Sequence, residues 1–152
     1  MAPTLLHADD ADDLEMVREV GAVLAWRLGP EAVEEKCRSD DPGGTEIRKK
    51  ALKAWLDKNA PLIQEVDARV AEVVPLAYPP SKKMVDPVQA VSTQVKAMFL
   101  ESIFEGKSPE ESAGICRQLA DPANPRWHNP GRPNVDMALA TLYDWKIKRA
   151  AK

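Results

Sequence analysis

Thirteen prolines and seven glycines divide this 152-residue chain into short stretches, and within each stretch the apolar residues recur at intervals of three or four. That spacing places apolar side chains on one face of an α-helix. Alternating β-branched runs joined by hairpin turns, which would indicate strands, do not occur. The pattern therefore predicts an all-α fold, a compact bundle of about six to seven helices.

Glycine and proline also predict where the helices begin and end. Gly29 is expected to stop the first helix and Pro30 to open the next, because proline is well tolerated at the first helical position. Pro61 is expected to break or kink the chain. The proline-rich segment 75–87 favours extended backbone, which makes it the best linker candidate. The predicted helices span about 10–28, 30–38, 45–58, 61–74, 87–105, 108–120 and 134 to the C-terminal end.

Three helix starts carry a specific signal. Ser108 and Glu111 form the two ends of a capping box, in which the serine oxygen accepts from a first-turn amide and the glutamate reaches back. Thr45 and Asn134 are residue types that can cap the first turn of the helices that follow them.

A length of 152 residues is typical of one domain, so residues 1–152 are expected to form a single helical domain. Two segments resemble each other, PEAVEEKCR at 30–38 and PEESAGICR at 109–117. Each comes after a long helix ending in glycine and before an Asp-Pro loop and another helix. This order predicts two pseudo-symmetric three-helix repeats, residues 10–58 and 87–149, bridged by 59–86. The alternative is an ordinary helical protein with glycine and proline breaks.

The only two cysteines, Cys37 and Cys116, lie at equivalent positions in these segments. Each follows an apolar residue by three or four, which places both on the apolar face of a helix. The favoured interpretation is two small buried apolar side chains. A disulfide between the copies, or a nucleophile activated by His128, are the alternatives.

The loops after the two cysteines differ, and the difference indicates a candidate site. The first loop, SDDPGG at 39–44, is short and featureless, whereas the 123–134 loop is elaborated. Arginine offers a planar fork for phosphate or carboxylate, and tryptophan offers a stacking face. The alternative is a rigid proline-rich loop pinned to the core by its tryptophan. The candidate ligand-binding residues of this loop are Arg126, Trp127, His128 and Arg132.

Composition and motifs exclude several classes of function. The net charge of −3, with acids and bases interspersed, does not favour nucleic-acid binding. No apolar run is long enough for a membrane span. The acidic N-terminal region lacks the pattern of a secretory signal, so a cytoplasmic location is expected, or an organelle if a presequence has been removed. Two cysteines and two histidines cannot supply a structural zinc site at these spacings, and no cofactor or catalytic motif is present.

By elimination, the sequence predicts a non-enzymatic interaction or structural subunit of a larger assembly. It would bind protein partners, or further copies of itself, through helical faces such as those of 61–74 and 91–103. The alternative is a helical domain, in one version enzymatic, that binds a small ligand or an anion with the 123–134 loop. Nucleic-acid binding through the basic end of the last helix is a third and weaker interpretation.

Overall fold

The computed structural model describes residues 11–120 and 132–151 of the chain. In these two ranges it contains five α-helices and one 3₁₀ turn and no strand, which confirms the all-α prediction. The elements are α1 (Ala11–Asp40), η1 (Pro42–Gly44), α2 (Thr45–Ala77), α3 (Pro87–Phe104), α4 (Pro109–Ala120) and α6 (Arg132–Ala150).

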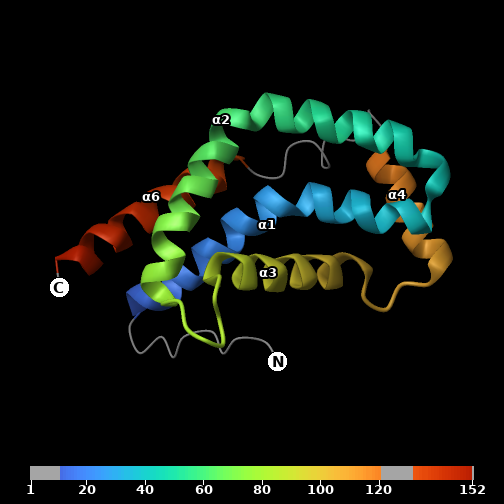
Figure 1. The fold of residues 1–152 in the computed structure, drawn as a ribbon. Coiled ribbons are helices and arrows are strands. Elements are labelled where there is room, and N and C mark those ends of the chain that lie inside the picture. The colour runs from blue at the N-terminus through green and yellow to red at the C-terminus, as the bar shows by residue number, and fades with distance from the viewer. Residues whose placement is uncertain (1–10, 121–131, 152) are drawn as a thin grey trace.

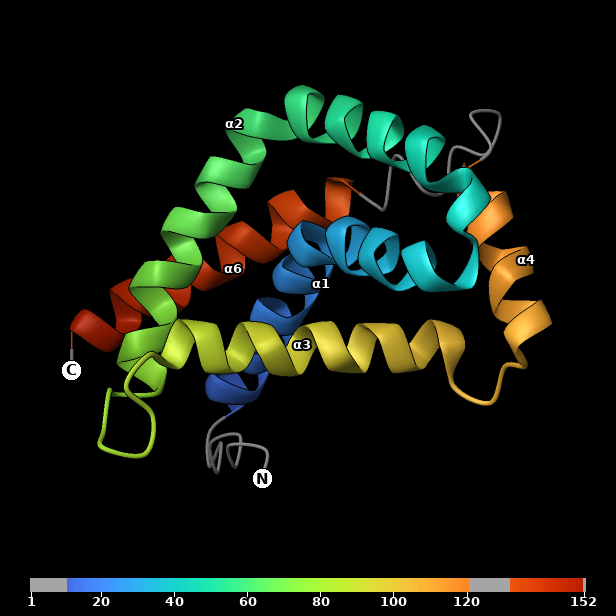
Figure 2. The same cartoon turned by 45° about the vertical axis from the view of Figure 1, so that its right-hand side comes forward.

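The other helices are arranged around α1. The bent helix α2 passes over α1, and α3 runs beside α1 on the other side (Figure 1). The short helix α4 closes one end of the molecule, beside the junction of α1 and α2, while α6 packs against α1 and α2 at the other end (Figure 2). Helix α4 thus belongs to one end of the molecule and α6 to the other, whereas α1 reaches both.

The predicted break at Gly29 and Pro30 is wrong, because α1 continues through both residues. A Cβ atom at position 29 would lie 2.8 Å from two ring carbons of Phe99, so glycine is what allows α3 to approach α1 this closely. Pro30 is buried inside the helix, and α1 bends in this region (Figure 2). A bend at proline is expected, since its ring cannot donate the helical hydrogen bond. Tertiary packing thus outweighs the local stop signal.

The predicted separate helices 45–58 and 61–74 are likewise one helix, α2, which contains Pro61 and Pro75. The chain bends strongly near Pro61 (Figure 1), so the kink foreseen there occurs without a break. The linker 75–87 begins only after Ala77, and it is compact. Within it, the backbone groups of Ser81 and Met84 bond to each other in both directions.

The helix starts agree with the sequence in one case of three. The capping box is confirmed, since the Glu111 amide donates to Ser108 Oγ at 3.1 Å and the Ser108 amide to Glu111 Oε1 at 3.4 Å. Thr45 is the first residue of α2, whose cap position is Gly44, and Asn134 lies within the first turn of α6. Gly106, with φ of 73°, provides the left-handed turn between α3 and α4.

Most apolar side chains form one cluster, which we call the main core. It lies where the first part of α1, the second part of α2, the start of α3 and α6 meet. Trp26 and Trp55 pack in it with ring centroids 5.0 Å apart. At its edge the Trp145 indole donates to Asp13 Oδ1 at 2.9 Å, which ties α6 to the start of α1.

A second, much smaller cluster occupies the opposite end, where α1, α3 and α4 meet. We call it the disulfide end. Its buried members are Val33, Cys37, Phe104 and Cys116.

Candidate functional site

The structure leaves the predicted ligand-binding loop untested. Arg126, Trp127 and His128 lie outside the described residues. Arg132 is the first residue of α6, and its side chain is also outside the described part. The anion-binding role of these four residues therefore stays a prediction.

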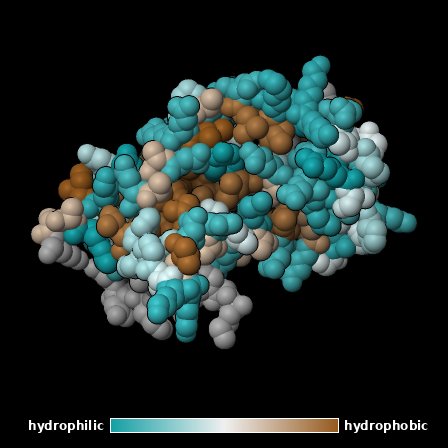
Figure 3. Space-filling view, in the orientation of Figure 1, coloured by the Kyte–Doolittle hydropathy of each residue, from teal (hydrophilic) through white to brown (hydrophobic). Residues whose placement is uncertain are grey.

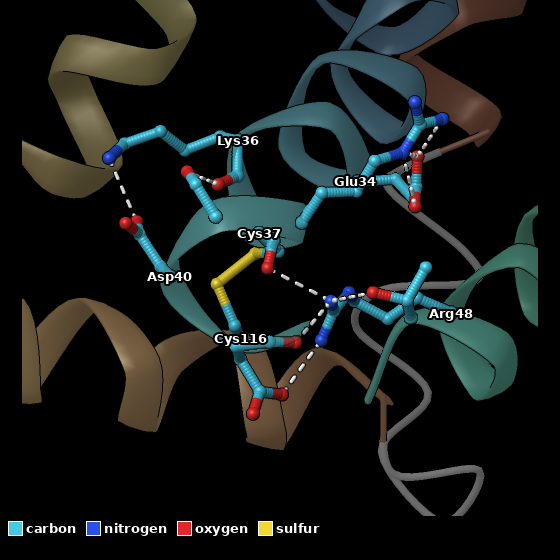
Figure 4. The surroundings of a disulfide bond; sticks show 10 residues. Glu34, Lys36, Cys37, Asp40, Arg48 and Cys116 are labelled. Atoms are coloured by element: carbon cyan, nitrogen blue, oxygen red, sulfur yellow. Dashed lines mark hydrogen bonds and ion pairs between the residues drawn. A yellow bond between two sulfur atoms is a disulfide. The ribbon is translucent and has the colours of Figure 1, made fainter. Parts of the chain in front are cut away.

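The two cysteines form a disulfide, with their Cα atoms 5.6 Å apart (Figure 4). Their burial was predicted correctly, since neither side chain is exposed. The favoured interpretation as two unbonded apolar side chains was wrong. Helical spacing predicts which face a cysteine occupies, but only the packing of α4 across the end of α1 brings the two sulfurs together. With both sulfurs bonded, the nucleophile alternative is excluded as well, since it needs a free thiolate.

Beside the disulfide lies a fully buried arginine, Arg48. It reaches from α2 to the last turn of α1, where its Nη2 donates to the carbonyls of Cys37 at 3.0 Å and Asp41 at 2.7 Å (Figure 4). Its Nη1 donates to Asp41 Oδ2 at 2.8 Å. A Cβ on Gly44 would lie 2.6 Å from both partners of this ion pair, so the glycine leaves room for it. The SDDPGG loop is therefore not featureless, because it encloses a buried ion pair.

A second buried charge, Glu34, is 1% exposed and pairs with Arg38 one turn later, at 2.7 Å. The hydrogen bond and the charge of Glu34 raise the pKa of Arg38. Both this pair and Arg48 direct their charges at protein atoms. The disulfide end is thus a structural assembly, and its charged groups are already used to hold helices together.

One small hollow opens between the start of α1 and α6. Its volume is about 130 Å³, and its lining residues are Asp12, Glu15, Thr141, Asp144, Trp145 and Lys148. Typical small-molecule sites are several times larger, on the order of 300–1,000 Å³. In the described parts of the chain no group of three or more histidine, cysteine or acidic side chains could hold a metal ion. The hollow can accept the end of one side chain rather than a metabolite.

The outer face of α6 carries exposed apolar side chains next to this hollow. Met137 is 71% exposed and Ile147 is 50% exposed, and Ala140 lies between them on the same face. Tyr143, at 48%, borders the face on the side of α2, where the guanidinium of Arg69 lies 4.9 Å from its ring centre. We call Met137, Ala140, Asp144 and Ile147 the outer stripe.

The outer stripe lies opposite the buried face of α6, which carries Leu139, Leu142 and Trp145. Its members are spaced three, four and three residues apart, the spacing of a helix that packs against another helix. Hydrophobic side chains also reach the surface between α2 and α1 (Figure 3). The outer stripe differs from that surface because its members lie on one helix and have the spacing of a helix that packs against another helix.

The helical faces that the sequence predicted to bind partners are mostly packed inside the protein. Leu62, Val66 and Val70 of α2 are buried in the main core. On α3, Val91 is buried, and Met98 is the exposed member of its apolar set. A partner-binding surface on either helix would have to open the core.

Sequence reasoning missed the outer stripe, although a signal was present. This helix has apolar residues on its buried face, from Val135 to Trp145, and two more, Met137 and Ile147, on the opposite side. A helix with apolar residues on two opposite faces has more apolar surface than one core can cover.

Comparisons with protein-family models, with curated proteins and with solved structures return no match for this chain. Within the described residues, no helix is both long and apolar enough to cross a membrane.

Proposed function

We propose that this chain is a non-enzymatic binding subunit that docks a protein partner on the outer stripe of α6. The observation that carries the proposal is the exposure of Met137 and Ile147 on the face of α6 that is turned away from the main core. Single exposed apolar residues are common on protein surfaces, whereas a set in helix-packing register favours a docking site. Methionine is well suited to such a site, because its flexible side chain adapts to different partners.

The rest of α6 supports the proposal by holding the outer stripe rigidly. Leu142 is fully buried on the inner face, and Trp145 is fixed by its hydrogen bond to Asp13. Lys146 pairs with Glu72 of α2 at 3.0 Å. A helix anchored along its inner face presents its outer face without ordering cost, and such preorganisation favours binding.

The two-repeat architecture remains part of this proposal. It is supported by the disulfide, which joins the two equivalent cysteines, because a two-fold axis that passes between them would bring them close together. The units differ at their glycines, because α1 continues through Gly29 whereas the chain turns at Gly106. Superposition of the backbone of 10–58 on that of 87–149 tests the repeat.

The location of the protein is also a matter for proposal. The cytoplasmic location expected from the sequence stays a prediction, and the disulfide favours a different one. Disulfides persist in oxidising compartments, whereas cytosolic thiols are kept reduced. We therefore expect the partner to be met outside the reducing cytosol.

The test is capture of partners from the native source by a double variant, Met137→Ser with Ile147→Ser, followed by mass spectrometry. We expect the captured partner to be lost while the free energy of unfolding changes by less than about 1 kcal/mol, because the removed side chains are exposed. The matched control is Met98→Ser with Ile47→Ser, which removes a methionine at 57% exposure and an isoleucine at 55% exposure elsewhere. Equal capture by both double variants would contradict the proposal.

A further inference from the structure

We infer that the partner segment docked on α6 is an amphipathic helix that inserts a lysine or arginine into the hollow beside the outer stripe. The inference rests on the proposed function and adds the chemistry of the partner. It is argued from the way an acidic hollow and an apolar stripe share one edge.

The shared edge is Asp144. This residue is a member of the outer stripe and also lines the hollow. Thr141, which is half-buried, and Lys148, which is exposed, also line the hollow and lie on the α1 side of Asp144, whereas Tyr143 lies on its α2 side. A helix lying along Met137 and Ile147 would therefore have its middle turn directly beside the hollow.

The charge of the hollow favours a cation. Three carboxylates line it, those of Asp12, Glu15 and Asp144, against one ammonium group. That ammonium, Lys148 Nζ, lies 3.8 Å from Asp12, and Glu15 is 3.9 Å from Arg18, so both pairs are long and partly exposed. Since Asp12 and Glu15 already have partners, Asp144 is the carboxylate of the hollow that is offered here to a partner's basic side chain, and its charge disfavours anionic lipid and nucleic acid.

The size of the hollow sets what can enter. About 130 Å³ accommodates the end of a lysine or arginine side chain, and its wall includes the edge of Trp145. A long basic side chain can bury its methylene groups against apolar surface while its charged end reaches the carboxylates. The partner helix should then carry apolar residues about one turn on either side of that basic residue, facing Met137 and Ile147.

The experiment is a selection from a displayed library of a stable single helix, randomised on one face and bound to the intact, oxidised chain. We expect the enriched helices to carry a lysine or arginine between apolar residues. Their affinity should fall about tenfold or more for the Asp144→Lys variant and for the Ile147→Ser variant, and should not change for Ile47→Ser. Exchanging the peptide's basic residue for glutamate should restore binding to Asp144→Lys.

Several outcomes would overturn the inference. Enriched helices without a basic residue, or helices whose binding is indifferent to Asp144→Lys, would show that the hollow is not used. If the pure chain self-associates in sedimentation experiments and Ile147→Ser abolishes this association, the occupant of the outer stripe is a second copy of the chain instead. In either case, capture of the native partner that still depends on Met137 and Ile147 would leave the proposed function standing.

Discussion

The main core and the disulfide end of this molecule are held together by different means. Among the described residues, the main core contains twenty buried apolar side chains, whereas the disulfide end contains four, two of them the bonded cysteines. A buried aliphatic or aromatic side chain contributes about 1.5–3 kcal/mol. Burial of apolar side chains can therefore hold the helices of the main core together. At the disulfide end, so few apolar side chains are buried that their burial cannot outweigh the loss of chain entropy on folding.

The disulfide end compensates with specific bonds. The disulfide ties α1 to α4, and Arg48 ties the last turn of α1 to α2. Lys36 adds a contact between α1 and α3, with its Nζ 5.4 Å from the centre of the Phe104 ring. The comparison teaches that a helical chain with one large core can carry a small second one if covalent and ionic bonds replace apolar area.

The largest effect is expected from Asp41→Ala at the disulfide end. It leaves the fully buried Arg48 without its carboxylate, and an uncompensated buried charge costs about 3–5 kcal/mol. The free energy of unfolding from urea titration measures this. The control is Asp57→Ala, which removes an exposed ion pair with Lys53 and should cost less than about 1 kcal/mol. Equal losses in the two variants would mean that the buried pair is not what holds this end.

A comparable or slightly smaller loss is expected from Leu142→Ala, which probes the main core. The side chain is fully buried, so its removal should cost about 2–5 kcal/mol through lost burial and the cavity left behind. Urea titration of the oxidised protein gives the value, with Leu76→Ala on the surface as control. A loss of only a few tenths of a kcal/mol would show that apolar packing is not what holds this region.

Removal of the disulfide by Cys37→Ser with Cys116→Ser should cost about 2–4 kcal/mol, and it should act locally. Because Val33 and Phe104 are the buried apolar side chains that would remain there among the described residues, hydrogen exchange should accelerate in α4 and in the end of α1. Amides of α6 should keep their relative protection. Uniform acceleration across all helices would indicate one cooperative unit and would remove the distinction between the two regions.

A smaller loss, about 1–3 kcal/mol, is expected from Gly29→Ala, at the close approach of α1 and α3. The new methyl group would lie 2.8 Å from the Phe99 ring. The combination with Phe99→Leu should recover part of the loss. Gly21→Ala in the same helix is the matched control, since nothing lies within 4 Å of a Cβ there. That variant should gain up to about 1 kcal/mol from higher helix propensity, so thermal melting should shift in opposite directions.

The smallest effect is expected at Glu72 on the surface above the main core. A hydrogen bond from Lys146, with the charges of Lys146 and Arg69, lowers the pKa of Glu72 below its ordinary value of 4.5. The ionised form is thus favoured by folding. Its contribution to stability is present above pH 4.5 and disappears as the pH falls through the lower pKa of the folded state.

Glu72→Gln should therefore be slightly less stable than the wild type at pH 7, and the difference should shrink as the pH is lowered below 4.5. The unfolding midpoint in urea, measured over a series of pH values, tests this. The exposed Glu65→Gln on the same helix is the control. A difference that grows on acidification would contradict the direction of the pKa shift.

The sequence predicted what depends on local chemistry. The capping box at Ser108, the bounds of α3 and the burial of both cysteines follow from residue types and helical spacing. The break expected at Gly29 did not occur, and at Pro61 the kink occurs without a break, because buried contacts of α1 and α2 outweigh the cost of an internal proline. Sequence rules based on neighbouring residues include the cost of an internal proline but not the stabilisation from contacts with distant segments.

The rest depended on the packing of segments distant in the chain. The pairing of Cys37 with Cys116, and the burial of Arg48 behind Gly44, exist only once α4 and α2 meet the end of α1. The outer stripe of α6 could have been found by plotting all apolar residues of that helix, since Met137 and Ile147 are visible in the sequence. The candidate loop around Trp127 lies outside the described residues and stays a prediction.

The disulfide also closes residues 37–116 into a covalent band, with residues 1–36 before it and residues 117–152 after it. The described parts of these two flanking segments are joined by the hydrogen bond that Trp145 donates to Asp13. A single backbone cut in the exposed 79–83 segment, which contains Lys82 and Lys83, would open the band without releasing any piece. Such a cleaved molecule would migrate as one species until the disulfide is reduced. The same segment is a suitable place for the new termini of a circularly permuted chain.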